Sequence, residues 1–228
     1  QQLCIMAVNT EAYQSIKQEL DAKQVTLIAV SKTKPVEDII TLYELGQRDF
    51  GENYVQELVD KQVQLPKDIR WHFIGHLQSN KVKYIAPFVH LIHGVDSLKL
   101  LKEINKEAAK NNRVIDVLLQ VHIAQEETKF GMDEEELNLT MSEFENLKMS
   151  NVNIVGLMGM ASFSDDLEKV RGEFRNLKML FNKSADKFTT NHSPLTTLSM
   201  GMSGDYAIAV EEGLSLIHIS EPTRQAEI

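Results

Sequence analysis

The chain is organised around the stretch Val25-Thr26-Leu27-Ile28-Ala29-Val30-Ser31-Lys32-Thr33-Lys34-Pro35. Its first six residues are apolar or β-branched, which is typical of a strand buried on both faces. The apolar run ends at Ser31 and Lys32, and Pro35 opens a helical pattern. A lysine at the end of a buried strand is costly unless it has a function there, because burial disfavours its charged form. The free amine attacks carbonyl groups, so Lys32 is a candidate Schiff-base lysine.

The composition of the chain excludes several classes of protein. Its 228 residues are 43% hydrophobic and 25% charged, as in ordinary globular proteins, and the net charge of −9 argues against nucleic acid as a partner. The single cysteine, Cys4, rules out a disulfide framework and a thiolate metal cluster within the chain. No apolar run is long enough to cross a membrane and no secretory signal is visible, so we expect no membrane partner and a cytoplasmic location.

Strand and helix patterns alternate along the chain. We expect strands at residues 25–30, 49–51, 70–74, 91–95, 114–123, 152–159, 196–200 and 215–219. We expect helices at residues 11–24, 36–45, 55–64, 80–88, 98–111, 134–148, 165–187 and 206–212. Such alternation indicates a parallel sheet with right-handed crossovers, and eight strand–helix units predict a single (β/α)8 TIM barrel. A doubly wound open sheet is the alternative, but it normally carries a glycine-rich turn after its first strand, where this chain has no glycine.

The chain divides into three expected segments. Residues 1–24 are a helical lead-in, residues 25–220 form the barrel, and residues 221–228 are an atypical tail. The last helix of the barrel is missing or replaced by this tail. Since no linker or low-complexity segment interrupts the pattern, the barrel is expected to be one domain.

Polar residues collect where the expected strands end. In a barrel of this kind the active site lies at the carboxyl ends of the strands, and phosphate commonly binds beside the last two. Glycines and hydroxyl groups crowd these two ends, in Ser199-Met200-Gly201-Met202-Ser203 and in His218-Ile219-Ser220. A lysine on the first strand that faces a phosphate pocket describes a site for a phosphorylated aldehyde. Pyridoxal 5′-phosphate (PLP) is the cofactor that fits this description.

Other chemistries fit these residues less well. A lysine-dependent aldolase acting on a phosphosugar needs acid–base groups near the lysine, and no carboxylate is obviously placed for that. No two histidines have metal-ligand spacing on one helix face, so we expect no metal. His72 and His122 lie within apolar strands and are expected to be hydrogen-bonded core residues. Met200 and Met202 are expected to pack, with a cofactor ring as one candidate partner.

Four motifs along the chain carry a resemblance to a known family. They are Ala29-Val30-Ser31-Lys32-Thr33-Lys34-Pro35, Phe50-Gly51-Glu52-Asn53-Tyr54-Val55-Gln56-Glu57, Trp71-His72-Phe73-Ile74-Gly75-His76-Leu77-Gln78-Ser79-Asn80-Lys81 and Leu198-Ser199-Met200-Gly201-Met202-Ser203-Gly204-Asp205. From about Val25 to Leu216, the sequence resembles the YggS/PROSC family of pyridoxal phosphate homeostasis proteins. The resemblance implies a barrel of the alanine racemase N-terminal-domain type and a protein that binds PLP and maintains its intracellular supply.

The resemblance also implies roles for individual residues. Lys32 would hold PLP as an internal aldimine, Asn53 would lie beside the cofactor, and its phosphate end would be held by Ser199, Met200 and Ser203. No catalytic residue is expected, because the family has no established reaction. We expect a monomer, with cofactor-free PLP enzymes as candidate recipients.

An amino-acid racemase or decarboxylase of the same barrel type is the alternative function. Such enzymes carry a second, β-rich domain that closes the site and supplies a catalytic tyrosine. This chain ends with its eighth strand, which would leave one face of the cofactor open to water and weaken carbanion chemistry. We therefore expect a holder of PLP without robust turnover.

The last expected strand departs from the family pattern. The family places an Arg-Ile-Gly motif there, with the arginine facing the pyridine nitrogen and the glycine letting the backbone approach the phosphate. This chain has His218 and Ser220 at those positions. We expect both residues to contact the cofactor, less favourably than arginine and glycine would, and the sequence from Ile217 onward to be a truncated or frameshifted end.

Overall fold

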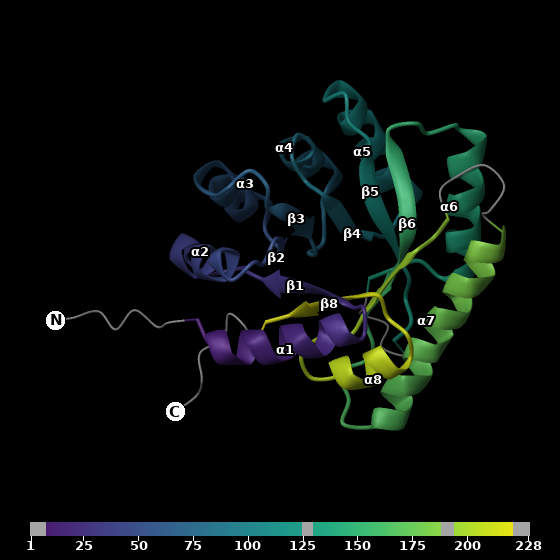
Figure 1. Ribbon diagram of the computed structural model, residues 1–228. Helices are drawn as coiled ribbons and strands as arrows, with labels where there is room; N and C mark the ends of the chain where they lie inside the picture. Colours follow the sequence, from purple (N-terminus) through teal and green to yellow (C-terminus); the bar gives the residue numbers. More distant parts are fainter. Residues whose placement is uncertain (1–7, 125–129, 188–193, 221–228) are drawn as a thin grey trace.

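The computed structural model describes residues 8–124, 130–187 and 194–220. Eight strands, each parallel to its neighbours, form a closed barrel (Figure 1). They are β1 (Thr26–Val30), β2 (Asp49–Glu52), β3 (Arg70–Phe73), β4 (Leu91–Val95), β5 (Ile115–Gln120), β6 (Val152–Gly159), β7 (Thr197–Met200) and β8 (Leu216–Ile219). The barrel is closed by β1 and β8, which pair from Thr26 with Leu216 to Ala29 with Ile219. The expected (β/α)8 TIM barrel is confirmed, and the doubly wound alternative is wrong.

Helices connect the strands and surround the barrel. They are α1 (Thr10–Ala22), α2 (Val36–Glu44), α3 (Val55–Gln64), the 3-10 helix η1 (Ser79–Lys81), α4 (Val82–Ile85), α5 (Leu98–Lys110), α6 (Glu134–Asn146), α7 (Leu167–Lys187) and α8 (Tyr206–Glu211). The helix expected at 80–88 is replaced by η1 and the single turn α4. Pro87 accounts for the early end, because proline has no backbone N–H to continue the helical hydrogen bonds, although Ala86 before it still has helical backbone angles. No helix follows β8 within the described residues, and the expected tail at 221–228 lies outside them.

The helix that precedes the first strand packs against the barrel. Tyr13 and Leu20 of α1 are buried, and the Tyr13 hydroxyl donates to Gln47 Oε1 at 3.1 Å. On the other side, the Tyr206 hydroxyl of α8 donates to Glu19 Oε2 at 3.2 Å. Figure 1 shows α1 running beside β1 and β8. The segment expected as a lead-in is therefore part of the helical layer around the barrel.

Two sets of apolar side chains form the core, one inside the barrel and one between strands and helices. The inner set comprises Ile28, Leu91, Leu118, Met158 and Leu216. The outer set includes Leu27, the neighbour of Ile28 in β1. Side chains alternate along a strand, so Lys32, four residues after Ile28, shares the inner side. The strand pairing continues to this point, because the Ser31 N–H donates to Gly51 O at 2.9 Å. Lys32 therefore lies at the mouth of the barrel.

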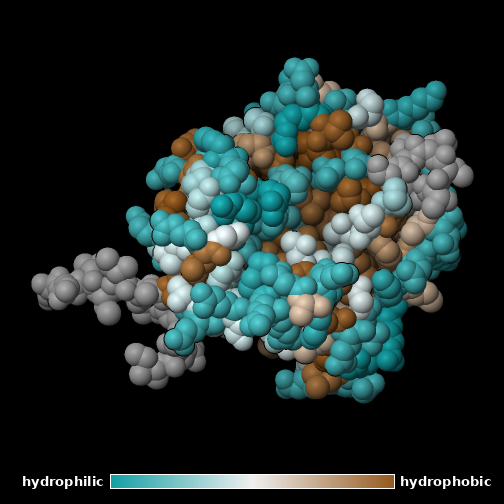
Figure 2. Space-filling view, in the orientation of Figure 1, coloured by the Kyte–Doolittle hydropathy of each residue, from teal (hydrophilic) through white to brown (hydrophobic). Residues whose placement is uncertain are grey.

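The surface follows the usual division between hydrophilic helices and an apolar interior. Figure 2 shows hydrophilic side chains over the surrounding helices and hydrophobic ones gathered toward the middle of this face. Within the described ranges, no helix combines the length and the apolar composition needed to cross a bilayer.

Candidate functional site

Lys32 lies at the carboxyl end of the barrel. It follows β1 directly and is half-buried. Among the residues that the structure describes, no hydrogen bond or ion pair engages its ammonium group. Lysines held partly away from water are normally paired, because the charged group loses hydration there. An unpaired lysine at the mouth of a barrel is therefore a candidate for reaction with a ligand.

Asn53 follows β2 at the same end of the barrel. Its side-chain Oδ1 is buried and has no hydrogen-bond partner among the described residues. Gly75, after β3, lets the neighbouring loop come close, because a Cβ atom there would lie 2.4 Å from the Asn53 backbone oxygen. A buried acceptor without a donor costs about 1–3 kcal/mol. A ligand that offers a donor at this point would remove that cost, so Asn53 fits the predicted place beside a cofactor.

The loops after β7 and β8 bring two predicted phosphate ligands together. The Ser220 N–H donates to Ser203 Oγ at 3.2 Å. Ser199 is buried within β7 and pairs in register with Met158, a residue of the inner set, so its side chain faces the barrel interior. Met200, the last residue of β7, belongs to the outer set instead. The binding roles of these four residues stay predictions.

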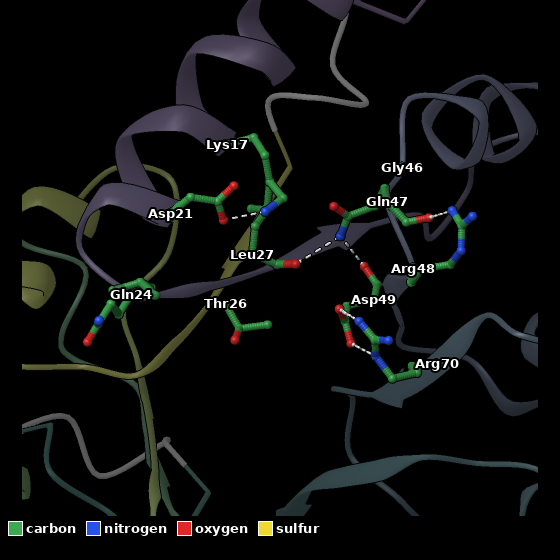
Figure 3. A pocket seen from close by; sticks show the side chains of 11 residues that line it. Lys17, Asp21, Gln24, Thr26, Leu27, Gly46, Gln47, Arg48, Asp49 and Arg70 are labelled. Atoms are coloured by element: carbon green, nitrogen blue, oxygen red, sulfur yellow. Dashed lines mark hydrogen bonds and ion pairs between the residues drawn. The ribbon is translucent and has the colours of Figure 1, made fainter.

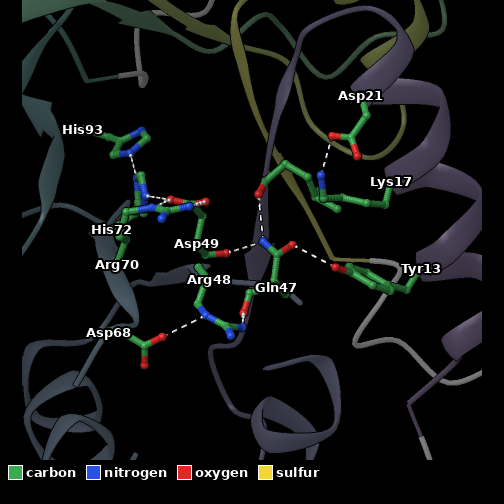
Figure 4. A network of polar contacts seen from close by, with 11 residues as sticks. Tyr13, Lys17, Asp21, Gln47, Arg48, Asp49, Asp68, Arg70, His72 and His93 are labelled. Carbon is green, nitrogen blue, oxygen red and sulfur yellow. Dashed lines mark hydrogen bonds and ion pairs between the residues drawn. The ribbon is translucent and has the colours of Figure 1, made fainter. Parts of the chain in front are cut away.

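The ring of His218 lies against another histidine inside the barrel. His218 Nε2 is 2.9 Å from His93 Nδ1, and His93 Nε2 is 2.9 Å from His72 Nδ1. The chain of contacts ends at Asp49, whose Oδ1 lies 3.0 Å from His72 Nε2 (Figure 4). Both ring nitrogens of His72 are engaged, which confirms the expectation of a hydrogen-bonded core histidine. The role of His218 at a cofactor stays a prediction.

Burial sets the charge along this histidine chain. It lowers the pKa of His218 to about 3 and lowers the pKa values of His72 and His93 below the ordinary value for histidine. Asp49 behaves oppositely: burial opposes its ionisation, but hydrogen bonds from His72 and Arg70 hold its pKa below the usual range. The histidines are therefore neutral near pH 7, and the charge of Asp49 is balanced by Arg70.

A second polar region lies at the opposite, amino end of the strands. An open pocket of about 370 Å³ lies between α1 and the starts of the first strands (Figure 3). Each of its three cationic side chains has an anionic partner: Lys17 pairs with Asp21, Arg48 with Asp68 at 2.9 Å, and Arg70 with Asp49. Because these charges are already neutralised, this pocket offers no free cation to a ligand.

A buried cation beneath the Lys32 loop was not anticipated from the sequence. Lys61 of α3 is 6% exposed and forms ion pairs with Glu52 and Glu57. The helical spacing could have indicated its burial, because Lys61 lies three residues after Leu58, on the face that α3 buries. Glu52 Oε2 has no hydrogen-bond partner among the described residues, and burial raises the pKa of Glu52.

Comparisons with known proteins agree with this geometry. The family model of the alanine racemase N-terminal domain matches residues 10–217. A pyridoxal phosphate homeostasis protein of Aquifex aeolicus is 42% identical over 194 residues, covering 85% of this chain and 83% of the relative. A human protein of the same name is 36% identical over 227 residues, covering 94% of this chain and 82% of the relative.

Solved structures show the same barrel. PipY of Synechococcus elongatus, solved with PLP bound, has a TM-score of 0.82 and 34% identity, covering 93% of this chain and 97% of PipY. Alanine racemase of Bartonella henselae has a TM-score of 0.68 and 14% identity, covering 94% of this chain but 58% of the racemase. At that identity the racemase shares the fold alone.

Proposed function

The chain belongs to the family of pyridoxal phosphate homeostasis proteins, and on that premise we propose that it holds PLP covalently through Lys32 as part of the intracellular homeostasis of the cofactor. The observation that carries the proposal is the half-buried, unpaired Lys32 at the mouth of the barrel, among the residues that the structure describes. When bound, PLP would supply an aldehyde, which condenses with a neutral primary amine and releases water.

The residues around Lys32 supply the remaining contacts in this proposal. Asn53 Oδ1 accepts a hydrogen bond from the ligand and so loses its buried, unpaired state. Ser203 Oγ accepts a hydrogen bond from the Ser220 N–H, and its own O–H is then available to donate to a phosphate. Ser199 adds a hydroxyl from the barrel interior, and Met200 adds a contact from the end of β7.

The phosphate end relies on uncharged donors. No lysine or arginine occurs from Ser199 to Ser203 or from His218 to Ser220. His218 is neutral near pH 7, since burial lowers its pKa to about 3. Hydrogen bonds from charged donors are roughly twice as strong as those from neutral ones, and a side chain at position 220 hinders close approach to the phosphate. We therefore propose that His218, toward the pyridine nitrogen, and Ser220, toward the phosphate, limit the affinity for PLP.

We favour binding of PLP over amino-acid turnover. The relatives at 36–42% identity carry the name of homeostasis proteins. We further propose a cytoplasmic monomer that passes PLP to cofactor-free PLP enzymes.

Absorbance spectroscopy tests the proposal. The protein is titrated with PLP, and the visible absorbance of the covalent adduct is followed for the parent and for Lys32→Ala. We expect the band to appear with the parent and to be absent from Lys32→Ala. Lys34→Ala is the matched control, because it removes the other lysine of the same loop, and it should keep the band. A full band in Lys32→Ala would contradict the assignment.

A further inference from the structure

Lys61 makes a complete set of hydrogen bonds under the loop that carries Lys32. Its ammonium donates to Ser31 O at 2.6 Å, to Glu52 Oε1 at 2.7 Å and to Glu57 Oε1 at 2.6 Å. An ammonium group has three N–H donors, so every one of them is used. The Ser31 hydroxyl also donates to Glu52 Oε1, at 2.6 Å.

These contacts hold the backbone on both sides of Lys32. On the side before Lys32, the Lys61 ammonium binds the carbonyl oxygen of Ser31 directly. On the side after it, the Thr33 N–H donates to Glu57 Oε1 at 2.6 Å, the same carboxylate oxygen that Lys61 binds. One buried cation therefore reaches the residue before Lys32 directly and the residue after it through a single carboxylate.

The backbone at this point needs such support. Thr33 has φ of 61°, in the left-handed region that β-branched residues rarely adopt. The chain turns there, because the Lys34 N–H donates back to Ser31 O at 3.1 Å. A strained conformation persists only where the surrounding contacts determine it, and such strain concentrates at ligand sites.

Stability alone does not explain this arrangement. A buried ion pair seldom stabilises a protein more than well-packed apolar side chains of similar volume would. Here Glu52 Oε2 also stays unpaired among the described residues, which adds a cost. The ion pairs lie beneath the Lys32 turn and connect α3 and β2 to it.

We propose that Lys61 is a positioning residue: with Glu52 and Glu57 it fixes the backbone on both sides of Lys32, so that the Lys32 amine meets the aldehyde of PLP in one orientation. The proposal rests on the proposed function, because it requires that Lys32 is the lysine that binds PLP. Preorganisation of this kind strengthens binding by lowering the conformational entropy lost when the ligand binds.

Two ligands separate positioning from general damage. PLP reacts with Lys32, whereas pyridoxine 5′-phosphate has the same ring and phosphate but no aldehyde. We expect Lys61→Met to lower the affinity for PLP about tenfold and the affinity for pyridoxine 5′-phosphate less than about twofold. Only the covalent contact with PLP depends on the orientation of Lys32. Equal weakening of both ligands, or of neither, would overturn the proposal.

Glu57 provides a milder pair of variants in case Lys61→Met does not fold. Glu57→Ala removes the acceptor of the Thr33 N–H and should lower the affinity for PLP but not that for pyridoxine 5′-phosphate. Glu57→Gln keeps an acceptor oxygen and should have an affinity for PLP close to that of the parent. Without any ligand, hydrogen exchange at the Thr33 amide should be faster in Lys61→Met and Glu57→Ala than in the parent. Unchanged exchange at Thr33 in both variants would contradict the proposed support of the loop.

A control variant lies at the other end of the barrel. Arg70→Met also removes a cation from a buried carboxylate, Asp49, but Arg70 does not contact the Lys32 loop. It should leave the ratio of the two affinities unchanged, and a changed ratio would show that general loss of stability mimics the effect. Different results refute the two proposals. If PLP in the parent forms its adduct at a residue other than Lys32, the proposed function is refuted. If the adduct forms at Lys32 and Lys61→Met leaves the affinity for PLP unchanged, only the positioning role is refuted.

Discussion

Gly75→Ala should destabilise the barrel and weaken the binding of PLP together. A Cβ atom at Gly75 would lie 2.4 Å from the backbone oxygen of Asn53 and 2.8 Å from its Cα, whereas ordinary contacts begin near 3.4 Å. The two loops must therefore separate by about 1 Å, the difference between 3.4 and 2.4 Å, and overpacking of this kind costs about 1–3 kcal/mol of unfolding free energy. Because the conflicting atoms are backbone, no side-chain rotation relieves the clash.

The same displacement moves the proposed contact with the cofactor. Asn53 carries the buried, unpaired Oδ1, and a shift of about 1 Å takes a hydrogen bond of ordinary length out of range. Loss of one such bond costs about 0.5–1.5 kcal/mol, which corresponds to a Kd for PLP that is about two- to tenfold higher.

Denaturant unfolding and a titration with PLP measure the two effects on the same samples. Gly172→Ala is the matched control, because Gly172 lies inside α7 and an added Cβ would have no atom within 4 Å apart from its chain neighbours and the nearby helix backbone. Its free energy of unfolding should rise by about 0.5–1 kcal/mol, because alanine favours a helix over glycine by this amount, and its Kd for PLP should equal that of the parent. If Gly75→Ala has the stability and the Kd of the parent, the argument that Gly75 holds Asn53 in place is refuted.

Two further predictions concern the histidine chain and the last strand. Burial lowers the pKa values of His72 and His93 in the folded state, so below about pH 6.5 the unfolded chain binds more protons than the folded one. The free energy of unfolding should therefore fall by up to about 1.4 kcal/mol per pH unit for each histidine as the pH drops below that value. Denaturant unfolding between pH 5 and pH 8 checks this, and a His93→Leu variant with an unchanged slope would contradict it. His218→Arg combined with Ser220→Gly should lower the Kd for PLP, because a charged donor replaces a neutral ring and a close approach to the phosphate becomes available. An unchanged Kd in the titration would show that β8 contributes little to the site.

The fold was predictable because its signals are local. Buried runs such as Val25 to Val30 alternate with amphipathic helices, and eight repeats of this pattern leave few alternatives to a barrel. The difference at 80–88 is also local, since Pro87 lacks the N–H that would extend α4. The position of α1 was less accessible, because burial of Tyr13 and Leu20 depends on surfaces formed by the rest of the chain.

The site was predictable only where its residues follow strands directly. Lys32, Asn53 and Ser203 could be placed at one end of the barrel because they follow strand ends, and their roles at a cofactor stay predictions. The contacts of Lys61 could not, because they join α3 to a loop 30 residues earlier in the chain. The contact of His218 with His93 likewise depends on closure of the barrel. Sequence patterns predict that the barrel closes, but they do not predict which side chains then face one another.

The position of the covalent adduct tests the central claim most directly. The protein is mixed with PLP, reduced with borohydride, digested and analysed by peptide mass spectrometry. We expect the reduced pyridoxyl group on the peptide that carries Lys32, and no comparable labelling of Lys34 or Lys61. Labelling mainly at another lysine, or equal labelling of the Lys32→Ala variant, would contradict the account.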